Sequence, residues 1–295
     1  MRIAFVAVAL FLAGCGRSAG LENPEAPPAQ LLSSCAPAAA TCVSHAPFDQ
    51  QLVTWTLAAP AVFGGTVRRV NASTEPSTPS TLGRPLFVVS VDQPLWGAEL
   101  PAEVTVDPAG AAMPAVGEVA FFFVRGQTYG VGVVTIEQQR VAPGTFSNIV
   151  TGVPEIRRLA AERALYDELI AAQRVVVAEV RSVASQPAGF IGSEHDPVWT
   201  DSTVSVECTL RGPASPVADV RFAASSDIAW FQSPKLTAGQ HGLLLLHLAN
   251  SDAQYSGTYG PGDSYGGHVV GRQHDSLAAS ELQHVVDLLA CPPSL

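Results

Sequence analysis

Two stretches of this chain have nearly the same sequence and decide its fold. Residues 89–97 read VSVDQPLWG and residues 204–212 read VSVECTLRG, so both follow the pattern V-S-V-[DE]-x-x-L-x-G. A pattern of this length seldom recurs by chance, and self-similarity within a chain indicates repeated structural units. The sequence therefore predicts an internal duplication with one β-rich unit around each stretch.

The segments that flank the two stretches also match in kind. Valine-rich segments precede them at residues 62–70 and 176–183, and candidate strands follow at residues 104–106 and 220–222. Each copy continues through a glycine turn into an apolar run, at residues 117–124 or 242–247. The alternation and the content of Val, Phe and Thr are typical of half-buried strands.

A helix is expected at the end of each copy. The first is predicted near residues 154–173, with Pro154 at its first position, where proline is favoured. The second is predicted near residues 276–290, with Asp275 and Ser276 as capping residues. A further short helix is expected around residues 48–57.

About five strands and a closing helix in each copy suggest a small closed barrel of the OB type. The order of the shared pattern, the acid within it and the buried strand after a glycine turn resembles the netrin-like and tissue-inhibitor-of-metalloproteinase-like domains. The resemblance implies a mainly β fold with two tandem OB-like (netrin-like) five-stranded barrels, each followed by an α-helix. It does not extend to the mechanism of those inhibitors, in which a Cys-x-Cys at the free N-terminus chelates zinc. Here the spacing is Cys35-x6-Cys42, and a tether precedes it.

The N-terminus has the layout of an export signal. Arg2 precedes an apolar run, residues 3–12, and the run ends in Leu12-Ala13-Gly14-Cys15. This ending resembles a bacterial lipobox, which implies removal of residues 1–14 and a lipid such as palmitate on Cys15. Residues 15–34 are rich in Pro and small residues, which predicts a flexible tether. We expect the first barrel and helix within residues 35–173 and the second within residues 174–295.

Composition restricts the class of partner. The formal net charge is −10 at pH 7, which disfavours nucleic acid because phosphate binding needs clustered Lys and Arg. No second apolar stretch of about 18 residues follows the signal, so no spanning helix is predicted. The expected location is the cell membrane or outer membrane, through the lipid anchor, facing the periplasm or the cell surface.

The remaining cysteines, Cys35, Cys42, Cys208 and Cys291, are even in number, and in an exported protein this favours disulfides. Three connectivities are possible, and we favour Cys35–Cys42 with Cys208–Cys291 on closeness in sequence.

Two polar segments contain candidate metal ligands. His195 and Asp196 lie in one polar loop, and His268 and His274 lie in a second segment before Asp275. Solvated loops are the favoured interpretation of both groups, so no cofactor is predicted. His241 and His247 flank the apolar run and are interpreted as surface residues. Asp92 and Glu207, the matched acids, are expected to bind loop backbone.

Three aromatic residues are candidates for contact with a ligand. Trp96 precedes the shared glycine, and we favour its burial over contact with a partner. Tyr259 and Tyr265 lie in a glycine-rich segment that could form a ligand-contacting rim, although a long surface loop is the favoured interpretation. The chain has no G-x-S-x-G elbow and no phosphate loop. We therefore expect a non-catalytic module that binds an envelope protein or glycan. The alternatives are a protease-inhibitor-like protein and a metal-dependent hydrolase built on His195, Asp196, His268 and His274.

Overall fold

The computed structural model describes residue 42 and residues 47–72, 85–97, 99–125, 133–135, 140–184, 198–225, 230–249 and 267–294. The signal, Cys15, the tether, Cys35, His195, Asp196, Tyr259 and Tyr265 lie outside these residues. The first unit comprises α2 (Gln50–Ala58), β1 (Ala61–Ala72), β2 (Leu86–Trp96), β3 (Glu103–Asp107), β4 (Val119–Val124), β5 (Val133–Thr135) and β6 (Arg140–Val141). Helix α3 (Ile149–Ala171) follows, and then β7 (Arg174–Val183), β8 (Trp199–Arg211), β9 (Val217–Ala223), β10 (His241–Leu248), β11 (His268–Val270), β12 (Ser276–Ala278), η1 (Ala279–Glu281) and α4 (Leu282–Ala290).

The chain is mainly β, as predicted, and its two sheets have the same strand order. The order is β5-β3-β2-β1-β4-β6 in the first sheet and β11-β9-β8-β7-β10-β12 in the second. In the second sheet β11 also pairs with β10, and this pairing closes a five-stranded barrel. In the first sheet the described residues pair β5 with β3 alone, so the described part of this sheet is open.

The central hairpins of the two sheets are irregular at corresponding positions. In β1–β2 the register shifts at Val62/Phe63, Gly64/Gly65 and Val67/Arg69, and in β7–β8 it shifts at Val175/Val176, Val177/Ala178 and Val180/Ser182. A bulge bends its strand and increases the local twist. The first strand of each sheet therefore curves in the same way, which is what wrapping around a small core requires.

The turns before β4 and β10 also match at the level of single hydrogen bonds. Gly117 has a φ of 85° and Gly239 a φ of 81°. Glycine enters this region of backbone conformation without steric cost. The Gly117 N–H donates to the Val67 carbonyl and the Gly239 N–H to the Val180 carbonyl, both at 2.8 Å. Glycine at these turns therefore joins the fourth strand to the first in each sheet.

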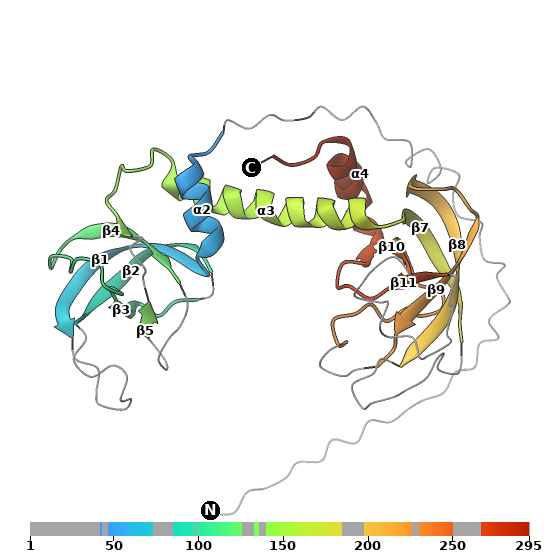
Figure 1. Cartoon of the computed structure of the whole chain (residues 1–295), viewed down its shortest axis with the longest axis horizontal. Helices are drawn as coiled ribbons and strands as arrows, with labels where there is room; N and C mark the ends of the chain where they lie inside the picture. Colours follow the sequence, from blue (N-terminus) through green and yellow to red (C-terminus); the bar gives the residue numbers. More distant parts are fainter. Residues whose placement is uncertain are drawn as a thin grey trace, which may run out of the picture.

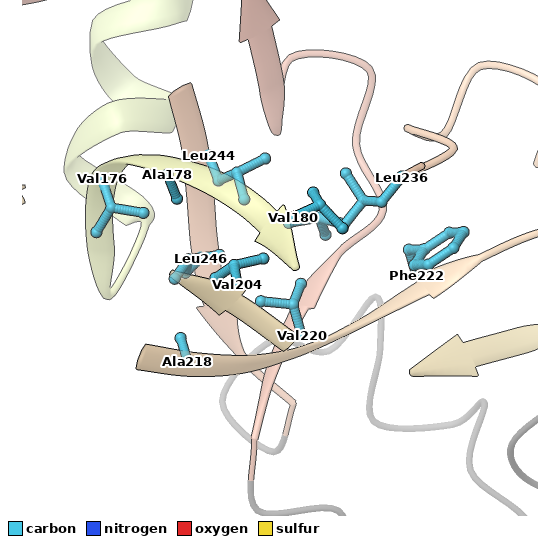
Figure 2. Close-up of a cluster of buried hydrophobic side chains, with 11 residues drawn as sticks. Val176, Ala178, Val180, Val204, Ala218, Val220, Phe222, Leu236, Leu244 and Leu246 are labelled. Carbon is cyan, nitrogen blue, oxygen red and sulfur yellow. The ribbon is translucent and has the colours of Figure 1, made fainter. Parts of the chain in front are cut away.

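Both faces of the central strands are buried. In the second sheet the interior cluster contains Val176 and Ala178 of β7 with Leu244 and Leu246 of β10, and Figure 2 shows these side chains converging inside the barrel. Val175, Val177, Leu243 and Leu245 point to the opposite face, where Leu169 of α3 and Val285 of α4 cover them. Burial on both faces explains why the run at residues 242–246 is apolar throughout rather than alternating.

Helix α3 serves both units. Its N-terminal part, with Ile149, Val153 and Ile156, packs with α2 on the outer face of the first sheet, while Leu169 near its end packs on the second. Figure 1 shows the two sheets at opposite ends of this long helix. No helix within the described part of the chain is long and apolar enough to span a membrane.

The predicted helices exist, but their boundaries differ from expectation. Asp49 caps α2, and its carboxylate accepts the N–H groups of Gln51 and Leu52, as capping side chains commonly do. Helix α3 begins at Ile149, so Pro154 lies inside the helix rather than at its start. Residues 276–278 form β12 rather than the start of a helix, because their backbone pairs with β10 at Gly242–Leu244.

The favoured disulfide pairing is wrong. Cys42 is bonded to Cys291, with a Cα–Cα distance of 5.2 Å across a sequence separation of 249 residues. Cys208 is also disulfide-bonded. Closeness in sequence was a poor guide because Cys42 lies beside the end of α4, where its Sγ is within 3.7 Å of the Ala290 carbonyl. The Cys42–Cys291 bond consequently joins the first unit to the second.

Candidate functional site

The structure does not gather the predicted histidines around a common centre. The His274 Nδ1 lies 2.9 Å from Glu168 Oε2 on α3, while His268 begins β11. Among the described residues, no group of three or more His, Cys, Asp or Glu side chains is arranged to hold a metal ion. His195 and Asp196 lie outside those residues, so their part of the metal hypothesis stays a prediction.

His247 is buried rather than exposed. Only 3% of its side chain is accessible, and its Nε2 lies 2.9 Å from Oδ1 of Asp275, whose side chain is fully buried. The Asp275 Oδ2 accepts the N–H groups of Gly271 (2.7 Å) and Arg272 (2.8 Å). Asp275 is therefore an internal tie between β10 and the β11–β12 connection, and the expectation that it caps a helix is wrong.

The matched acids Asp92 and Glu207 bind strand side chains rather than loop backbone. Asp92 accepts hydrogen bonds from Thr66 Oγ1 (2.6 Å) and Ser90 Oγ (2.8 Å). These hydrogen bonds, Thr66 first, hold the pKa of Asp92 below its ordinary value, because they favour the charged form. Glu207 lies 2.9 Å from the His241 ring. Asp92 therefore links β2 to the adjacent β1, whereas Glu207 links β8 to β10 on the far side of β7.

Trp96 is 42% exposed, so the preference for its burial is wrong. The guanidinium of Arg157 lies over its ring at 5.1 Å and also donates to the carbonyl of Ala59, the C-cap of α2. In the second unit Arg211 holds the position of Trp96 in the shared pattern, and its guanidinium donates to Ala172, the C-cap of α3. A guanidinium thus satisfies the carbonyl at a helix end in both units, and in the first unit Trp96 covers it by a cation–π contact.

A buried guanidinium lies at one end of the closed barrel. Arg174 pairs with Leu246, which belongs to the interior cluster, and cross-strand partners share one face of a sheet. Its side chain therefore points into the barrel end, and the residue is only 3% exposed. One guanidinium nitrogen donates to the Ser215 carbonyl at 3.1 Å, and the buried Nε has no hydrogen-bond partner among the described residues.

His268 lies on the same face of the barrel as Arg174. It is the register partner of Val220, another interior residue. Burial and the charge of Arg174 lower the pKa of His268 from 6.5, which keeps the imidazole neutral at neutral pH. The imidazole makes its hydrogen bond to the backbone of Asp219, so the N–H donors at this end of the barrel are those of Arg174, whose charge disfavours a cation there.

Sequence reasoning identified His268 but interpreted it as a possible metal ligand, and it missed Arg174. One feature of the sequence could have pointed to Arg174: it is a charged residue at the start of the valine-rich β7, where the first unit has Ala61.

No protein-family model matches the chain, and no curated protein shows significant similarity to it.

Proposed function

We propose that this protein is a lipid-anchored protein of the cell envelope in which two tandem OB-like, netrin-like modules, related by duplication, bind a protein or glycan without catalysis. The anchor is Cys15 in the lipobox-like Leu12-Ala13-Gly14-Cys15. The corresponding strand orders, bulges and glycine turns support the duplication. The step from barrel to binding is an analogy from the architecture.

The observation that carries the proposal is the Cys42–Cys291 disulfide, together with the bonded state of Cys208. Disulfides persist in oxidising compartments and are rare in the cytosol, so they support export. The bond also connects the two units at a second place besides α3. A pair of modules fixed in this way presents two related surfaces with little loss of conformational entropy on binding, which favours a binding role.

The first experiment tests the anchor. In the native bacterium, wild-type protein is expected in the membrane fraction with incorporated labelled palmitate. The Cys15→Ser variant is expected to be unlabelled and released from the membrane. Retention of the unlabelled variant in the membrane fraction would refute the anchor.

The second experiment tests binding without turnover. Soluble protein comprising residues 35–295, which retains every described residue, is titrated with purified cell-wall glycan and with isolated envelope proteins. Saturable binding with full recovery of the intact ligand is the expected result. If each protein molecule cleaved more than one ligand molecule, the protein would be an enzyme instead. Loss of that cleavage when a chelator removes metal ions would then favour the metal-dependent hydrolase.

A further inference from the structure

A buried cation without an acid is costly to a protein. Arginine remains protonated in proteins, and a buried charge is tolerated when it is paired and fully hydrogen-bonded. Among the described residues no carboxylate forms an ion pair with Arg174, and burial is the one cause that lowers the pKa of its guanidinium. Arg174 therefore loses hydration without a compensating charge from the described part of the chain.

The fold itself does not require arginine at this position. In the first sheet the equivalent pair on the first and fourth strands is Ala61 and Val124, both members of the interior cluster. Gly212, with φ 89°, packs directly on the Arg174 side chain, because a Cβ at this position would lie 3.0 Å from Arg174 Cγ. The second barrel thus holds a long charged side chain at the position that Ala61 occupies in the first sheet.

The groups around Arg174 favour an anion as its partner. The adjacent imidazole of His268 is uncharged and cannot serve as a counter-ion. The acid that interacts with His268 is Asp219, whose carboxylate accepts a hydrogen bond from Thr203 Oγ1 at 3.2 Å. Asp219 lies between Ala218 and Val220, both interior residues, so strand alternation directs its side chain outward, away from Arg174. The short connection that covers Arg174, residues 212–217, is exposed to solvent.

We propose that this end of the second barrel binds a single oxyanion group, a carboxylate or a phosphate, with Arg174 as its ligand. The guanidinium offers parallel N–H donors that match two oxygens of a planar or tetrahedral anion. The bound oxygens satisfy Nε and neutralise the buried charge. This site goes beyond the proposed function and holds whether or not Cys15 carries lipid.

The test compares the soluble protein, residues 35–295, with two matched variants. Arg174→Met removes the charge and keeps the length of the side chain. Arg181→Met removes an arginine from the same strand whose side chain is 59% exposed and paired with Glu179. Thermal unfolding is measured with sodium phosphate, sodium acetate and, at equal ionic strength, sodium chloride. The phosphate and acetate arms distinguish the two kinds of anion.

Phosphate or acetate is expected to raise the Tm of wild type and Arg181→Met by about 3–5 °C at ten times its dissociation constant. Arg174→Met is expected to lose this increment and, without added anion, to unfold at or above the wild-type Tm. In wild type the NMR titration of His268 is expected to move to higher pH on anion binding, because the anion offsets the charge of Arg174.

Two results would overturn the proposal. The first is an equal response to anions in Arg174→Met and wild type, which would reflect a general salt effect on the whole protein. The second is a lower Tm for Arg174→Met with no anion response in wild type, which would make Arg174 a structural tie to Ser215.

Discussion

Removal of the Asp275 carboxylate should destabilise the second unit more than any surface substitution. Asp275→Ala leaves three buried donors without their acceptor: the His247 imidazole and the N–H groups of Gly271 and Arg272. Each buried donor left without its acceptor typically costs about 1–3 kcal/mol, and the costs of donors that share one acceptor do not simply add. We expect the free energy of unfolding to fall by about 3–5 kcal/mol.

The assay is urea unfolding followed by tryptophan fluorescence in a Trp55→Phe/Trp96→Phe background. The remaining reporters, Trp199 and Trp230, pack against each other in the second unit, with ring centroids 5.5 Å apart. Asp287→Ala is the control, because Asp287 is exposed on α4 and accepts from Gln283 of the same helix. The control is expected to change stability by less than about 0.5 kcal/mol.

A third variant separates the carboxylate's charge from its shape. Asp275→Asn retains one oxygen for the two backbone N–H groups but turns its amide nitrogen toward His247, so an intermediate loss of about 1–2 kcal/mol is expected. The reasoning is refuted if Asp275→Ala behaves like Asp287→Ala, or if Asp275→Asn costs as much as the alanine variant.

Three other results are expected. Peptide mapping of unreduced protein should recover Cys42 linked to Cys291, and the Cys42→Ser/Cys291→Ser variant should lose up to about 5 kcal/mol, the chain-entropy value for so long a loop; recovery of a Cys208–Cys291 peptide would contradict the structure. The Asp92 carboxyl should titrate by NMR with a pKa below 3.8. Its stabilising effect is therefore present above pH 3.8 and is lost as the pH falls through the lowered pKa. Thr66→Val should raise this pKa, and an unchanged pKa would rule out Thr66 as the cause. Gly65→Ala should be clearly destabilising, by about 1–3 kcal/mol, because its Cβ would lie 2.3 Å from the Ser90 carbonyl oxygen; Gly64→Ala, whose Cβ would meet a phenyl carbon of Phe121 at 3.0 Å, should cost less in the same unfolding assay.

The candidate site shows where sequence reasoning reached its limit. Trp96 and Arg211 occupy one position of the shared pattern, and the two residues have little in common as side chains. The role of Arg211 in binding a helix end falls to Arg157 of α3 in the first unit, where Trp96 covers the guanidinium. Only the tertiary structure shows this correspondence, because the guanidinium comes from α3 in the first unit and from β8 in the second. His247 was interpreted as a surface residue because its acceptor, Asp275, lies 28 residues away in the chain.

The sequence alone determined the features that local chemistry controls. Alternating valines, glycine turns and the repeated V-S-V-[DE]-x-x-L-x-G predicted the mainly β class, the strands and the correspondence between the two units, because strand propensity and positive φ depend on few neighbours. Tertiary structure alone decided which cysteines pair, that α3 is shared between the units, and that Arg174 is buried. These features depend on long-range packing: β10 pairs with β7 beside Arg174, and the further pairing of β10 with β11 closes the barrel that holds this charged residue.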